Sequence, residues 1–191
     1  MSDTAAWPVE GRIAISTRTA LTVIVGATLM TLAAKVQVPF WPVPMTLHTL
    51  AVMTFAVALG PHIAVSILLT YLAAGVAGLP VFSGSPERGV GLAYLVGPTG
   101  GYLLGYLVAS WLVGRLALGK GSLGRVGAML AGMLPVYAIG AAWLTIYVPV
   151  DRVLTVGVMP FLLGDLVKIG VVATGSALLT TSLTGFRAKG K

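Results

Sequence analysis

The sequence has no cysteine and very little charge. Only 9% of its 191 residues are Asp, Glu, Lys or Arg, whereas a soluble domain has about 25%. The absence of cysteine excludes disulfide bonds and thiolate chemistry. His48 and His62 lie far apart in a chain with five carboxylates, so no metal site is indicated. No serine has the His and Asp partners of a nucleophile. We therefore expect neither an enzyme nor a metalloprotein.

Apolar residues dominate the chain instead. They make up 57% of it, and the mean hydropathy is +0.98. A globule with so few charges could not cover its surface with polar groups, which indicates an integral membrane protein. We predict an all-α fold, with one domain over residues 1–191 that forms a compact bundle of six membrane spans. The expected spans are about 13–36, 46–59, 63–78, 98–118, 126–148 and 161–184.

The distribution of Lys and Arg predicts the orientation. Eight of them fall on one side of the expected spans and two on the other, which places both termini in the cytoplasm. The net charge of +7 does not indicate nucleic-acid binding, because the basic residues occupy short loops and tails. The eight are Arg12, Arg18, Arg115, Lys120, Arg125, Arg187, Lys189 and Lys191, and the two are Arg88 and Arg152.

A carboxylate and an ammonium interrupt the last expected span. Asp165 and Lys168 are three residues apart and therefore share one face of that helix. A charge in a bilayer costs about 2.5–3.5 kcal/mol by insertion scales, so such residues usually face a bundle interior or a wet cavity. One interpretation is a self-neutralising pair that only holds helices together. The other is a pair that lines a pocket for a small polar ligand.

Two segments on the predicted outer side are not expected to be regular helices. Residues 37–45 hold three prolines yet are apolar and aromatic, which suggests a lid over the outer surface or, alternatively, an interfacial connector anchored by Trp41. Residues 79–101 form the longest such stretch, and Gly97, Gly100 and Gly101 allow backbone N–H groups to face a ligand. Between them, Gly60-Pro61-His62 breaks two short spans into a hairpin. Both outer segments and the Asp165 end of the last span converge on one side.

Two glycine-rich stretches resemble nucleotide motifs without their context. Gly114–Gly121 matches the phosphate-loop spacing, but Gly121 stands where Ser or Thr is needed and a membrane helix precedes it. Gly119–Gly124 spells G-x-G-x-x-G without a strand before it. We therefore expect no cofactor and no ATP chemistry in this chain. His48, on an apolar face, is expected to make a packing hydrogen bond rather than a ligand contact.

Four blocks of sequence form a further pattern. They are Val38-Pro-Phe-Trp-Pro-Val-Pro-Met-Thr-Leu-His-Thr-Leu-Ala51, Gly78-Leu-Pro-Val-Phe82, Leu95-Val-Gly-Pro-Thr-Gly-Gly-Tyr-Leu-Leu-Gly105 and Pro160-Phe-Leu-Leu-Gly-Asp-Leu-Val-Lys168. Together these blocks resemble the BioY family, the substrate-binding S components of energy-coupling factor (ECF) biotin transporters. The resemblance covers about residues 13–183, in order.

The resemblance implies a membrane protein that binds biotin from outside, in a bacterial cytoplasmic (inner) membrane. It implies as partners a transmembrane coupling subunit and cytoplasmic ATP-binding cassette ATPases, which alone use ATP. It also implies that Asp165 and Lys168 are the polar pair of the site, while Ala27 and Thr31 stand at the coupling face of the first helix. Further implied ligand contacts are Gly97, Thr99, Gly100 and Tyr102 in the glycine-rich block and Ser83 in the binding loop. From the chemistry of biotin itself, we expect Phe40, Trp41, Phe82 and Tyr102 to cover its apolar rings.

Two alternatives to this function remain open. A standalone biotin facilitator or secondary transporter would need no ATPases, and Asp165 would then be a proton site. A membrane enzyme or scaffold is disfavoured by the lack of catalytic clusters.

Overall fold

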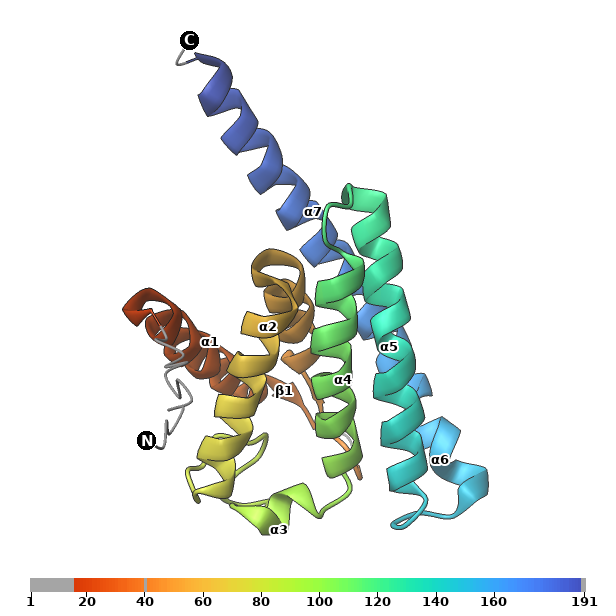
Figure 1. Ribbon diagram of the computed structural model, residues 1–191. Helices are drawn as coiled ribbons and strands as arrows, with labels where there is room; N and C mark the ends of the chain where they lie inside the picture. The colour runs from red at the N-terminus through yellow and green to blue at the C-terminus, as the bar shows by residue number, and fades with distance from the viewer. Residues whose placement is uncertain (1–15, 40, 190–191) are drawn as a thin grey trace, which may run out of the picture.

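Helices form most of the protein (Figure 1). The computed structural model describes residues 16–39 and 41–189, with side chains to residue 178. Phe40 and the first residues of the first expected span lie outside this part. The elements are α1 (Thr17–Lys35), β1 (Gln37–Val38), β2 (Met45–Thr46), α2 (His48–Val76), α3 (Leu92–Leu95), α4 (Gly100–Leu116), α5 (Ser122–Leu144), α6 (Val150–Gly157) and α7 (Met159–Lys189).

The element α2 is a hairpin of two helical segments. Gly60 has φ 77° and ψ 176°, a left-handed and non-helical conformation that glycine adopts without steric cost. His48 Nε2 lies 2.9 Å from the Tyr71 hydroxyl. In a straight helix these two residues would be about 35 Å apart at 1.5 Å per residue, so the chain reverses at Gly60. The break predicted at Gly60-Pro61-His62 is confirmed.

The core is built around α4, which lies between α2 and α5 (Figure 1). Glycines permit this close packing. A Cβ on Gly105 would lie 2.7 Å from Val136 Cα, and one on Gly132 would lie 2.2 Å from Val113 Cγ2. Gly105 and Ala109 are both buried, as expected for a small-residue face in membrane helix packing. The α4–α5 pair therefore depends on the absence of side chains at these positions.

Four helical stretches of the described chain are long and apolar enough to cross a membrane: Thr17–Lys35, His48–Val76, Ser122–Leu144 and Val150–Leu178. The hairpin α2 counts once among them although it has two segments, and α4 has only 17 residues. Each of the six expected spans corresponds to a helical segment, and the number that cross the bilayer stays a prediction. Large apolar side chains such as Leu123, Leu134 and Leu163 point away from the core, as a lipid-facing surface requires.

The short elements α3 and α6 gather at one end of the bundle, opposite the Gly60 turn and the α4–α5 turn (Figure 1). The expected loop between the fifth and sixth spans instead contains the helix α6, and the stretch 79–101 contains α3. The proline-rich segment is non-helical, as predicted. Its ends form the antiparallel pair β1–β2, with Gln37 opposite Thr46 and Val38 opposite Met45. We call residues 37–46 the lid hairpin.

Paired glycine variants test the α4–α5 packing. Gly105→Ala should destabilise the protein by about 1–3 kcal/mol, because its Cβ meets the backbone of Val136 and cannot be accommodated by a side-chain shift. Gly127→Ala is the control. It is exposed on α5 with nothing within 4 Å of its Cβ position, and it should stabilise by about 0.5–1 kcal/mol. Denaturation in detergent micelles measures both, and equal effects would contradict the close packing.

Candidate functional site

A small polar cavity lies where α2, α4, α5 and α7 meet beneath the lid hairpin. Its walls combine a carboxylate, an ammonium and several hydroxyl groups with apolar side chains. The volume of this cavity is about 20 Å³, which is room for about one water molecule. We call it the inner cavity. Its lining residues are Val43, Pro44, Met45, Thr46, Thr49, Tyr102, Tyr106, Val136, Tyr137, Phe161, Asp165 and Lys168.

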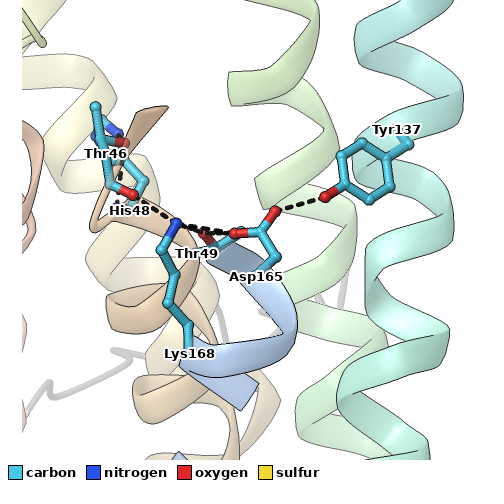
Figure 2. A network of polar contacts seen from close by, with 6 residues as sticks. All are labelled: Thr46, His48, Thr49, Tyr137, Asp165 and Lys168. Atoms are coloured by element: carbon cyan, nitrogen blue, oxygen red, sulfur yellow. Dashed lines mark hydrogen bonds and ion pairs between the residues drawn. The ribbon is translucent and has the colours of Figure 1, made fainter. Parts of the chain in front are cut away.

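The Asp165 carboxylate lines this cavity and is the centre of a network of polar contacts (Figure 2). It is only 6% exposed. Its Oδ1 accepts hydrogen bonds from Thr49 Oγ1 at 2.6 Å and Lys168 Nζ at 2.9 Å, and its Oδ2 accepts one from the Tyr137 hydroxyl at 2.6 Å. A carboxylate has about four acceptor positions. About one is therefore left for a ligand that presents an N–H or O–H group.

The Lys168 ammonium is fully engaged by the protein. It donates to Asp165 Oδ1, to Thr49 Oγ1 at 3.0 Å and to the backbone carbonyl of Thr46 at 2.8 Å. An ammonium has three donors, so no hydrogen remains free. Because Thr46 ends the lid hairpin, this ammonium fastens the lid to α7 as well as balancing Asp165.

Close approach of α7 to the lid depends on Gly164, the neighbour of Asp165. A Cβ at this position would lie 2.8 Å from Met45 Sδ. The side chain of Met45 therefore rests against the bare backbone of α7 and helps to close the inner cavity. A ligand larger than water does not fit the inner cavity in this conformation.

A second buried polar chain extends from the lid into the bundle. His48 Nδ1 lies 2.8 Å from Thr46 Oγ1, and its Nε2 lies 2.9 Å from the Tyr71 hydroxyl. That hydroxyl reaches the Val81 carbonyl at 3.4 Å. His48 does not line the inner cavity. It makes packing hydrogen bonds, as the sequence predicted, and it links the lid to the segment that follows α2.

A larger cavity of about 250 Å³ also adjoins the lid hairpin. We call it the outer cavity. Trp41 and Pro42 line it, whereas the next two residues, Val43 and Pro44, line the inner cavity. The lid hairpin thus contributes to the walls of both spaces. The other residues lining the outer cavity are Arg88, Ala93, Tyr94, Gly97, Pro98, Thr99 and Tyr147.

Some of the predicted ligand residues line the inner cavity, some line the outer cavity and some line neither. Asp165, Lys168 and Tyr102 line the inner cavity, and Trp41, Gly97 and Thr99 line the outer cavity. Phe82, Ser83 and Gly100 line neither. Phe40 lies outside the described residues.

Phe82 and Ser83 belong to the core behind the cavities. Phe82 is fully buried, and its ring stacks on Tyr94 at 4.6 Å between centroids. The Ser83 hydroxyl donates to Gln37 Oε1 and so joins the binding loop to β1. In this conformation both residues support the walls and do not face either space.

The glycines of the block 97–101 allow a tight turn of the backbone before α4. The N–H of Gly97 donates to the Tyr94 carbonyl and that of Gly100 to the Gly97 carbonyl, so neither is turned toward a ligand. A Cβ on Gly100 would collide with the Leu95 carbonyl oxygen. Trp143 Nε1 holds this turn from α5 by donating to the Gly97 carbonyl at 2.9 Å.

Tyr102 lines the inner cavity and also makes a hydrogen bond that joins two helices. Its hydroxyl donates to the Gly157 carbonyl at 2.7 Å, which fixes the end of α6 to α4. The ring lies against Gly140 and Gly157, where a Cβ would overlap it. Tyr102 can therefore offer its ring to a ligand, while its hydroxyl is already used.

Sequence reasoning missed four polar residues of the inner cavity. Thr46 and Thr49 fall within the Val38–Ala51 block, and Tyr106 and Tyr137 lie in spans that are otherwise apolar. A hydroxyl in a membrane helix was the available signal, but threonine also bonds to its own helix backbone, as Thr54 does to the Leu50 carbonyl. Only the three-dimensional arrangement distinguishes the two uses.

The proposed partner residues on α1 are not equally accessible. Ala27 is buried in the core, and its neighbour Gly26 packs against Ile67 of α2. Thr31 is half-buried and bonds to the Ala27 carbonyl. The exposed stripe of α1 consists of Leu21, Ile24, Val25, Thr28, Leu29 and Leu32.

Comparison with known proteins gives consistent matches over most of the chain. A family model described as "BioY family" matches residues 5–184. The "Biotin transporter BioY" of Thermotoga maritima is 37% identical over 76% of this chain and 85% of its own length. The "Probable biotin transporter BioY" of Pyrococcus horikoshii is 36% identical over 73% and 82%, and the "Biotin transporter BioY2" of Lactococcus lactis is 34% identical over 82% and 87%.

A solved structure has the same fold. It is the crystal structure at 2.1 Å of "the S-component for biotin from an ECF-type ABC transporter", and it matches with a TM-score of 0.74. The match covers 86% of this chain and 91% of that one at 24% sequence identity. The all-α S-component fold expected from the sequence is confirmed.

Removal of one or both charges tests the energetics of the pair. Asp165→Leu or Lys168→Met alone should cost about 3–5 kcal/mol, because each leaves an uncompensated buried charge or its unsatisfied partners. The double variant should be less destabilised than either single variant, since neither charge remains. Denaturation in detergent micelles provides the three values. Additive losses would show that the two groups do not interact.

Proposed function

The chain belongs to the BioY family, and on that premise we propose that it is the biotin-binding membrane subunit of an ECF transporter. It captures biotin from outside the cell and delivers it inward together with a coupling subunit and ATPases. The observation that carries this proposal is the Asp165 carboxylate, buried in a membrane helix, lining a cavity and retaining about one acceptor position.

The chemistry of biotin matches this carboxylate. The ureido ring has two N–H donors and one carbonyl, and an ionised carboxylate only accepts hydrogen bonds. We assign a ureido N–H to the remaining position on Asp165. Tyr102, Tyr106 and Phe161 supply apolar ring surface around it.

Binding of biotin requires the lid hairpin to open. The inner cavity holds about one water molecule, and the lid is held over it by the Lys168 bond to the Thr46 carbonyl. When the lid moves, one ammonium hydrogen is released. That hydrogen becomes available to the ureido carbonyl of biotin.

The partners and location follow the same premise. We place the protein in a bacterial cytoplasmic membrane with both termini inside, so that the lid, α3 and α6 face outward. A transmembrane coupling subunit and ATP-binding cassette ATPases supply the energy, because this chain has no phosphate-loop motif in its proper context. Since Ala27 is buried, the exposed stripe of α1 is the surface we propose for the coupling subunit.

Replacement of one oxygen tests the pocket. Asp165→Asn keeps the shape of the side chain but substitutes an amide for the acceptor that the ureido N–H requires. We expect biotin affinity to fall by about tenfold to a hundredfold, since a hydrogen bond to a charged group is worth about 1.5–3 kcal/mol. Binding of radiolabelled biotin to the purified protein measures it.

Asp151→Asn is the matched control for this measurement. Asp151 is an exposed carboxylate on α6 that lines neither cavity, and its loss should leave the affinity unchanged. Equal affinities of the wild type and Asp165→Asn would contradict the pocket role of Asp165.

Uptake experiments separate the ECF subunit from a standalone facilitator. If the proposed function is correct, cells that produce the protein with the coupling subunit and ATPases should accumulate labelled biotin, and an uncoupler that leaves ATP intact should not prevent it. Cells that produce the protein alone should accumulate much less. Equal, uncoupler-sensitive accumulation without the ATPases would instead support a proton-driven secondary transporter.

A further inference from the structure

The last residue of α1 is a lysine whose ammonium is bound by a distant loop. Lys35 Nζ donates to the Phe82 carbonyl at 3.1 Å, to the Ser85 carbonyl at 2.8 Å and to Ser85 Oγ at 3.1 Å. These two residues lie 47 and 50 positions further along the chain. A lysine at the end of a membrane helix usually extends toward the lipid headgroups. Here the protein itself uses all three donors of the ammonium.

The loop that receives this ammonium holds its acceptors in fixed positions. Phe82 is fully buried and its ring stacks on Tyr94, which fixes its carbonyl. Ser85 is also buried, and its hydroxyl donates to the Phe82 carbonyl at 2.7 Å. The lone pairs of that hydroxyl then accept from Lys35. Without the ammonium, three partially negative oxygen atoms would face one another, so the conformation of this loop depends on Lys35.

The same loop also holds the lid hairpin. We call residues 82–88 the clasp loop. The Ser83 hydroxyl donates to Gln37 Oε1 at the start of the lid, and Arg88 Nη2 donates to the Pro42 carbonyl in its middle at 3.3 Å. The end of the lid is bound separately, from α7. The clasp loop therefore connects the ammonium at the end of α1 with the first half of the lid.

We propose that Lys35 is a positioning residue that keeps the lid closed by holding the clasp loop, and so sets the rates at which a ligand enters and leaves the inner cavity. The inference rests on the proposed function, in which biotin binds when the lid opens. Neither Lys35 nor its two partner residues line either cavity, so a bound ligand leaves these bonds in place. Because they stabilise the closed lid equally with and without ligand, their loss changes both rates and leaves the equilibrium nearly constant.

Lys35→Met tests the proposal, because it keeps the length of the side chain and removes the ammonium. Association and dissociation of labelled biotin are measured on the full-length protein in detergent. We expect both rate constants to rise about tenfold, the factor for losing hydrogen bonds to a charged group, while Kd changes less than about twofold. Unchanged rates would overturn the proposal. Faster dissociation with unchanged association would also overturn it, because the ammonium would then act on the bound ligand.

Lys120→Met is the matched control, because it removes the same charge elsewhere. Lys120 is exposed in the turn between α4 and α5, at the end of the bundle opposite α3 and α6 (Figure 1), and lines neither cavity. This variant should keep the wild-type rate constants. Equal acceleration by both variants would assign the effect to net charge and contradict the role of Lys35.

Chemical rescue separates a bound ammonium from a general loss of order. Lys35 is exposed, so in Lys35→Ala a small amine can reach the three oxygen atoms. Ethylammonium should slow the dissociation of biotin from this variant toward the wild-type rate. Tetramethylammonium has the same charge but no N–H donor, and it should not. Equal dissociation rates in the two salts would contradict the proposal.

Hydrogen exchange of the ligand-free protein measures the lid itself and needs no biotin. The backbone amides of the lid hairpin should exchange about tenfold faster in Lys35→Met, and those of α5 should not change. Ser85→Ala removes one acceptor and should accelerate the lid amides by a smaller factor. Unchanged lid exchange in both variants would overturn the proposal. If the wild type binds no biotin, the proposed function fails, and the exchange rates still decide the role of Lys35.

Discussion

The structure depends on one buried ion pair within an apolar helix. Asp165 and Lys168 are 2.9 Å apart on adjacent turns of α7 and are almost completely shielded from solvent. Each charge is also satisfied by other elements: Thr49 and Tyr137 donate to the carboxylate, and the ammonium donates to the lid. A single charge in this position would be too costly to retain, whereas a pair with a full set of partners is tolerated. The same bonds draw α2, α5, α7 and the lid hairpin together, so the lining of the inner cavity and the helix contacts are one network.

Much of the fold could be predicted from the sequence, because apolar runs and helix-breaking residues are local signals. The reversal at Gly60 and the non-helical lid followed from single residues whose backbone preferences are strong. The helix α6 was missed because it is only eight residues long and was hidden within an apparent loop. Boundaries differed by a few residues where a helix begins without a side-chain cap, as at Gly121, after which α5 begins at Ser122 and not at about residue 126.

The site was predicted less completely, and for a physical reason. Asp165 and Lys168 were evident because charge in an apolar span is conspicuous. Their partners Thr49 and Tyr137 lie on other helices, and no local pattern distinguishes them from threonines and tyrosines that serve packing. Motif resemblance also grouped residues that the fold separates: Phe82 stacks in the core, while Thr99 and Asp165 line different cavities.

The saturation of Lys168 has a consequence for the resting protein. All three of its hydrogens and about three of the four acceptor positions on Asp165 are occupied by groups of the chain itself. A ligand that took one of these hydrogen-bonding positions would therefore have to replace a group of the chain itself. Because the Thr46 carbonyl is one of the groups bound by Lys168, such an exchange would reach the lid hairpin as well as the charged pair.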